Sequence, residues 1–161
     1  MTFYEIAKYV DVTVIFALII HVPSEVGCIH FLWKSGILFI ELPSGRRLSY
    51  MSPRLGVNQF GSESITYLEM QPNKKWDRSE SFGPKIVENI VQGISRDILC
   101  NTMKNLSDQF ICAHVHDELI IESSPDVPLD VICAKMAVAP DWLPNIELRA
   151  DGYACEFYMK D

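Results

Sequence analysis

The stretch FICAHVHDELIIE, from Phe110 to Glu122, constrains the fold more than any other part of the sequence. It places two histidines and an acidic pair in the middle of an otherwise apolar run. Strands that are almost continuously apolar are usually buried on both faces, and a bare carboxylate inside one costs roughly several kcal/mol of desolvation. The acidic pair is therefore expected at an edge. A hairpin meets this requirement if residues 110–115 and 118–122 form antiparallel strands and His116 and Asp117 form the turn.

The overall composition excludes several classes of protein. Of 161 residues, 48% are hydrophobic and 22% charged, which is ordinary for a globular domain. The longest apolar run, Val12 to Val22, is too short for a membrane span and follows no basic leader, so we expect a cytosolic protein with no membrane partner. Five widely spaced cysteines without a C-x-x-C pair argue against a disulfide framework and a zinc knuckle. A net charge of −7 counts against autonomous DNA binding, but not against a catalytic segment that borrows basic surface from another domain.

The order of expected elements predicts an α+β fold with an antiparallel β-sheet and packed helices. Because no repeat or Gly/Ser linker divides the chain, we expect one domain over residues 1–161. The predicted elements within residues 1–50 are a helix at 2–19 and a β-meander (29–33, 37–42, 47–50). They are followed by a strand at 65–71, a long helix at 84–106 and the hairpin at 110–122. A C-terminal helix and strand take up residues 129–158, with the helix at 129–138 and the strand within ELRADGYACEFYM, residues 147–159.

The long helix is predicted to be amphipathic, with Pro84 at its start. Its polar face carries Lys85, Asn89, Gln92 and Arg96, which recur at helical spacing. Such a face is either simply solvated or a binding surface, and spacing alone leaves both interpretations open. Its apolar stripe is predicted to comprise Val87, Ile90, Val91, Ile94, Ile98 and Met103.

The hairpin itself admits three interpretations. In the first, its polar turn is merely solvated. In the second, His114 and His116 alternate onto one strand face and bind a transition metal, as an H-x-H pair does in a metal hydrolase. In the third, Asp117 is a hard oxygen ligand for Mg²⁺, held rigidly at the tip for metal-assisted phosphoryl transfer.

Three further segments accompany VHDELIIE in a fixed order: LPSGRRLSY before the long helix, WDRSESFGPKIVENIVQGISRDIL leading into it, and APDWLPNIELRADGYACEFY at the end. Together the four segments resemble the C-terminal part of phage-type family A DNA polymerases, the DNA polymerase I family. The resemblance spans Leu42 to Tyr158 and implies a palm subdomain fragment. It also implies a DNA-directed DNA polymerase, a nucleotidyltransferase of DNA replication, encoded by a phage or prophage and acting in the cytoplasm of a bacterial host.

The resemblance assigns a role to each candidate site residue. Asp117 would coordinate the two catalytic Mg²⁺ ions, Glu118 would be a neighbouring acidic residue, and His116 would shape the turn near the primer terminus. Gln92 matches a glutamine of the family's helix that lies against the minor groove of the primer–template duplex, and Asn89 is a looser match. Amides can bond the acceptors that every base pair offers in that groove. Lys85 and Arg96 would add local positive charge, and the substrates would be deoxynucleoside triphosphates.

The sequence also departs from the family. FGPK, Phe82 to Lys85, replaces a tyrosine-glycine-glycine-lysine pattern, and Pro84 restricts the loop before the helix. We find no early palm motif with the partner of Asp117 and no fingers helix. We therefore expect the isolated chain to be inactive, with the N-terminal part of the polymerase as its missing partner. The alternatives are a non-catalytic polymerase relic that binds DNA or a protein partner, and the metal hydrolase that uses His114 and His116.

Overall fold

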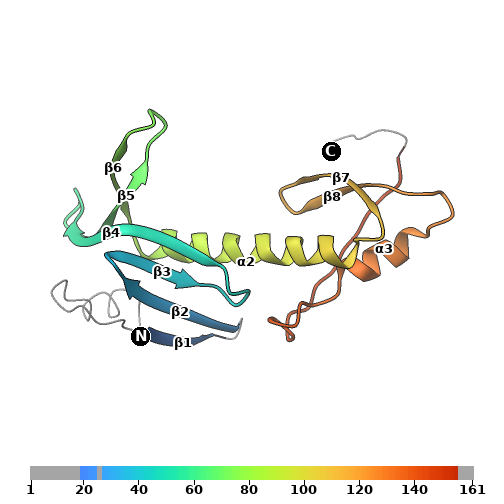
Figure 1. Ribbon diagram of the computed structural model, residues 1–161, viewed down its shortest axis with the longest axis horizontal. Coiled ribbons are helices and arrows are strands. Elements are labelled where there is room, and N and C mark those ends of the chain that lie inside the picture. Colours follow the sequence, from blue (N-terminus) through green and yellow to red (C-terminus); the bar gives the residue numbers. More distant parts are fainter. Residues whose placement is uncertain (1–18, 25–26, 156–161) are drawn as a thin grey trace. The chain divides into compact units, whose positions relative to one another are not determined.

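The computed structural model describes residues 19–24 and 27–155 and has an α+β architecture, as predicted. Strands and helices divide between two compact units, Met1–Gly93 and Ile94–Asp161 (Figure 1). The division falls inside helix α2, Gly83–Asn105. The absence of a Gly/Ser linker predicted one domain, but a continuous helix can join two units without any flexible linker. No helix within the described ranges is long and apolar enough to cross a membrane.

The first unit contains a six-stranded antiparallel sheet in which each strand pairs with its neighbour along the chain (Figure 1). The predicted meander and the strand after it are confirmed, whereas β1 and β6 were not predicted. The helix predicted at residues 2–19 lies outside the described residues, apart from Ile19, at which β1 begins. The strands are β1 Ile19–Ser24, β2 Gly27–Lys34, β3 Ile37–Glu41, β4 Arg47–Val57, β5 Glu63–Met70 and β6 Trp76–Ser81.

Strand β4 runs seven residues beyond the end predicted at Tyr50. The pairing of β4 with β5 shifts register between Met51 and Arg54, and Ser52 has a φ of 46°. A bulge of this kind accommodates a proline, because residues in the bulge do not have to donate a backbone N–H to the neighbouring strand, and proline has no N–H to donate. Pro53 therefore interrupts the pairing without ending the strand.

Helix α2 lies close to its predicted bounds, but its predicted apolar stripe is partly wrong. Val87 and Val91 are 55% and 56% exposed, while Ile86 is buried. Consecutive residues of a helix point in directions 100° apart, so Val87 faces solvent although the neighbouring Ile86 faces the core. In the first unit, α2 covers the sheet face that carries the buried residues Phe31, Ile40, Leu42, Tyr50 and Ile65.

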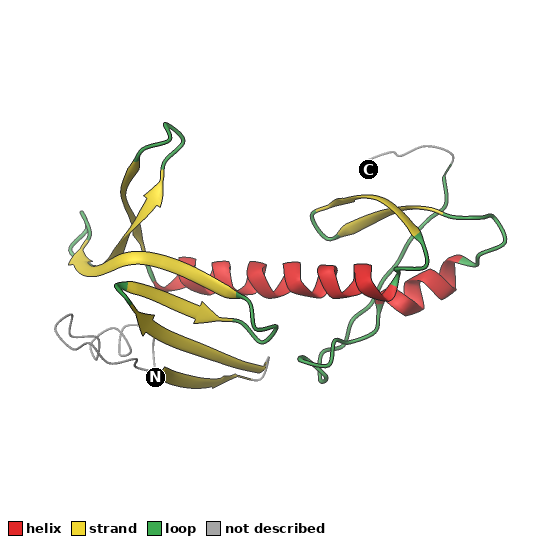
Figure 2. Ribbon diagram, viewed as in Figure 1, coloured by secondary structure: helices red, strands yellow, loops and turns green. Residues whose placement is uncertain are grey.

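The second unit combines the end of α2 with the two-stranded hairpin β7 Phe110–Val115 and β8 Glu118–Glu122, and with helix α3, Leu129–Met136. Its buried side chains include Leu99, Leu106, Ile132 and Leu143. The C-terminal strand predicted within residues 147–159 is absent from residues 147–155, which Figure 2 draws as loop. Gly152 instead lies against Leu129 and Cys133 of α3, so this segment packs on a helix and pairs with no strand. The rest of that prediction falls outside the described residues.

Candidate functional site

The hairpin around Asp117 has the predicted form. Val115 pairs with Glu118, so His116 and Asp117 form a two-residue turn, and Asp117 is exposed. His116 has a φ of 52°, and a positive φ at the first turn residue is the pattern of a type II′ hairpin turn. His116 therefore shapes the turn through its backbone, directly before Asp117.

The neighbouring histidine, His114, lies in β7 and contacts a cation. The guanidinium of Arg96 places Nη1 and Nη2 each 3.3 Å from the two ring nitrogens of His114. Arginine only donates, and a neutral imidazole offers one acceptor nitrogen, so one of these two contacts is a hydrogen bond at most. The contact joins the second half of α2 to the hairpin that presents Asp117.

This arrangement removes the basis of the His-x-His interpretation. Strand β7 ends at Val115, and His116 has left-handed backbone geometry, so the two histidines do not alternate along one strand. Arg96 lies alongside the ring of His114, and an adjacent cation opposes the binding of another cation there.

The carboxylates of Asp117 and Glu118 are the oxygen donors that Mg²⁺ prefers, and both residues are exposed. Across residues 19–24 and 27–155, however, no group of three or more histidine, cysteine, aspartate or glutamate side chains is placed to hold a metal ion. The described residues can therefore supply ligands to a Mg²⁺ site.

The polar face of α2 is largely exposed, as predicted, with Asn89 half-buried. Glu88, which was not among the predicted residues of this face, organises part of it. Its carboxylate forms an ion pair with Lys85 Nζ at 2.9 Å and accepts a hydrogen bond from Gln92 Nε2 at 3.0 Å. The i, i+3 and i, i+4 spacing of these residues was the available signal. Since an amide nitrogen carries two N–H groups, Gln92 keeps one for another acceptor.

Asn89 is anchored to the sheet. Its Nδ2 donates to the hydroxyl of Tyr50 in β4 at 3.1 Å, and Tyr50 packs edge-on against Tyr67 with ring centroids 5.0 Å apart. Burial raises the pKa of Tyr50, and burial together with Glu69 raises the pKa of Tyr67 to about 12. Both hydroxyls therefore stay protonated near neutral pH, and Asn89 has a fixed orientation on the helix.

The turn between β3 and β4, residues 42–46, also docks on α2, and sequence reasoning gave it no role. Arg46 Nη2 donates to the backbone oxygen of Gly93 at 2.7 Å. A Cβ atom at Gly93 would lie 2.8 Å from Leu42 Cδ1 and 3.3 Å from Arg46 Nη2, so any larger residue there would force these side chains to shift. The only signal was the presence of LPSGRRLSY and VQGIS among the family-like segments. The contact holds this turn beside Gln92.

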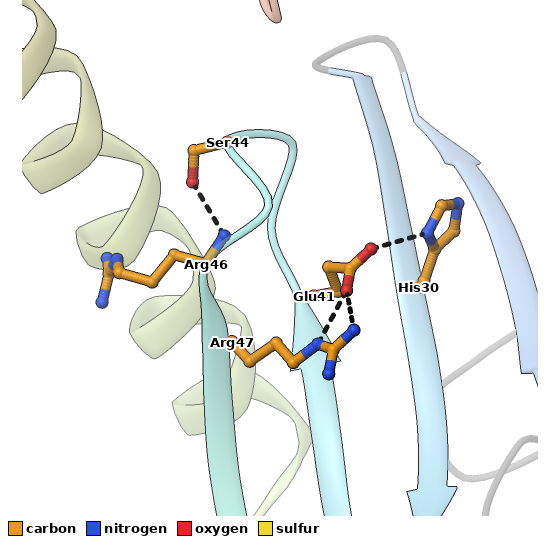
Figure 3. Close-up of polar contacts among 5 residues, drawn as sticks. All are labelled: His30, Glu41, Ser44, Arg46 and Arg47. Carbon is orange, nitrogen blue, oxygen red and sulfur yellow. Dashed lines mark hydrogen bonds and ion pairs between the residues drawn. The ribbon is translucent and has the colours of Figure 1, made fainter.

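Arg47 points away from α2 and belongs to a separate charge network (Figure 3). Its guanidinium donates to Glu41 Oε2 at 2.7 Å, and Glu41 Oε1 lies 3.4 Å from His30 Nδ1. Hydrogen bonds from Arg47 first and His30 second hold the pKa of Glu41 below its ordinary value. The two consecutive arginines thus serve opposite faces of the sheet.

Comparison with known proteins identifies a phage enzyme as a relative. The chain is 42% identical over 139 residues to a protein named DNA polymerase from Bacillus phage SP02. The match covers 81% of this chain and 21% of that relative, so the chain spans about a fifth of the relative's length. No protein-family model matches the sequence. No solved structure matches it either.

Proposed function

We propose that this chain is the C-terminal palm portion of a phage-type family A DNA polymerase, and that Asp117 is one of the carboxylates of its metal site. The observation that carries the proposal is the exposed Asp117 at the tip of a two-residue turn. A carboxylate held there can reach a metal ion and a phosphate group without being buried first, so it does not bear the desolvation cost of a charge inside the sheet. The similarity to a phage DNA polymerase supports the same assignment.

In the proposed reaction, the 3′-hydroxyl of a primer gives up its proton and attacks the α-phosphate of a deoxynucleoside triphosphate, the bond from the α-phosphorus to the bridging oxygen breaks, and pyrophosphate leaves. Bound Mg²⁺ would supply electrostatic stabilisation to the entering and leaving oxygens. The contribution of this chain is to hold Asp117 rigidly, with the left-handed His116 fixing the turn and Glu118 adding a second negative charge beside it. Catalysis of this kind depends mostly on positioning and electrostatics, so an incomplete set of ligands should leave the isolated chain inactive.

Helix α2 is the proposed contact with primer–template DNA in the cytoplasm of the bacterial host. Gln92 and Asn89 each retain an amide N–H after their internal hydrogen bonds, and the minor groove offers acceptors on every base pair. Lys85 and Arg96 would contribute positive charge toward the backbone, although Glu88 pairs with Lys85. This surface would check the geometry of a base pair without reading its identity.

A chimera tests the proposal directly. The segment of the phage polymerase relative that matches this chain would be replaced by this chain, and primer extension would be measured with Mg²⁺ and four deoxynucleotides. We expect extension by the chimera and a loss of at least about a hundredfold in Asp117→Asn, because a bridging metal ligand is removed. The matched control is Asp126→Asn, which changes another exposed aspartate and should leave the rate unchanged. Undiminished extension by the Asp117→Asn chimera would exclude the proposed role.

A further inference from the structure

The sheet of the first unit has a second face, which α2 does not cover. Side chains of directly paired residues in antiparallel strands lie on the same face, and residues two apart in one strand share it. The register therefore joins Leu32 to Phe39, Ile37 to Met51, Met51 to Leu68, and Met70 to Trp76. We call this surface the outer face, and its apolar residues are Leu32, Ile37, Phe39, Met51, Leu68, Met70 and Trp76.

The outer face carries a partly exposed apolar band that crosses five strands, in which Met51, Met70 and Trp76 are exposed and the other four apolar residues are half-buried. None of its seven apolar side chains is buried within the described part of the chain. Met70 and Trp76 are 58% and 55% exposed, and they are direct cross-strand partners. Contiguous apolar surface of this kind usually marks an interaction site, because leaving it in water is unfavourable.

Charged and polar residues border the band, and several of them are held by contacts within the unit. Arg47 and His30 both contact Glu41 at one side. At the other side, Arg78 donates to Thr66 Oγ1 and to the Ser52 backbone oxygen, each at 3.0 Å. An apolar centre with a polar rim is the composition of a protein–protein interface. Nucleic acid is held mainly through cations along the contact, whereas the centre of this surface is apolar, so the surface favours a protein partner.

We propose that the outer face is the surface on which the rest of the polymerase body docks. This inference rests on the proposed function. The chain matches only 21% of its phage relative, so most of that relative's mass lies outside the matched segment and is available as the occupant. Tryptophan and methionine are enriched at interface centres, since they bury a large apolar area and adapt to the opposing surface. Trp76 and Met70 are therefore the expected anchors.

A reconstitution experiment tests this docking surface. The phage polymerase relative, lacking the segment that matches this chain, would be expressed as the partner, and its affinity for the full 161-residue chain would be measured by biolayer interferometry. The test variant is the double substitution Met70→Glu and Trp76→Lys, which places opposite charges at one cross-strand pair and keeps the hairpin favourable. The control is Phe60→Lys, which alters a residue 82% exposed between β4 and β5, outside the outer face.

We expect the unchanged chain and the control to bind the partner, and the double variant to bind at least about tenfold more weakly. Equal binding by the double variant would overturn the proposal. So would concentration-dependent dimerisation of the chain that the double variant abolishes, because the occupant would then be a second copy. Primer extension by the reconstituted pair is scored separately. If the double variant loses binding but the pair with the unchanged chain shows no extension, the docking surface is supported and the catalytic proposal is excluded. If the pair with the unchanged chain extends a primer but the double variant binds equally well, the catalytic proposal is supported and the docking surface is excluded.

Discussion

Replacing Gly93 by alanine should destabilise the protein, although alanine is the better helix former. In an exposed helix position, the exchange of glycine for alanine gains about 1 kcal/mol. At Gly93, the new Cβ would lie 2.8 Å from Leu42 Cδ1. Leu42 is 1% exposed, so its methyl group has no free space into which to turn.

The magnitude follows from three contributions. Overpacking of a well-packed site costs roughly 1–3 kcal/mol. Displacing Arg46, whose Nη2 would be 3.3 Å from the new Cβ, weakens its part-buried hydrogen bond to the Gly93 oxygen, at a cost of about 1 kcal/mol. The gain in helix propensity offsets about 1 kcal/mol of this total. We therefore expect a net loss of roughly 1–3 kcal/mol in the free energy of unfolding.

Urea denaturation followed by circular dichroism would measure this loss. Cys100→Ala, at an exposed position of the same helix, serves as the control and should change the free energy of unfolding by less than about 0.5 kcal/mol. In a Leu42→Ala background the clash is relieved, so Gly93→Ala should cost less there than in the unchanged chain. A stabilisation of about 1 kcal/mol by Gly93→Ala alone would refute the close approach of the turn to α2.

Three other outcomes are expected. The purified chain should not extend a primer with Mg²⁺ and four deoxynucleotides, and template-directed extension above a no-enzyme blank would contradict the proposal that its own residues do not make up a working metal site. The lowered pKa of Glu41 means that its interactions stabilise the fold above the ordinary value of 4.5 and are lost as the pH falls through the lower folded value. Arg47→Ala should therefore make the free energy of unfolding depend less on pH, which denaturation measured at several pH values between about pH 6 and pH 3 would show. Tyr50→Phe removes the acceptor of the Asn89 N–H and should cost about 1 kcal/mol in urea denaturation, so an unchanged midpoint would argue against that bond.

The sequence by itself determined the features that depend on local chemistry. The hairpin was predictable because an acidic pair inside an apolar run has to lie at a turn, and the observed strand bounds are the predicted ones. The bounds of α2 were predictable to one residue from Pro84 and the helical period. The exposure of Asp117, Gln92 and Arg96 followed from the same two patterns.

The tertiary structure decided the features that depend on what packs against what. Val87 and Ile86 are equally compatible with an apolar stripe, and only the sheet beneath α2 selects Ile86 as the buried residue. Strand β4 continues past Pro53 because β5 is present to pair with it beyond the bulge. The contacts of Arg46 with Gly93 and of Arg96 with His114 join residues 47 and 18 positions apart. Periodicity along one element cannot predict such contacts, because they form only when separate elements meet.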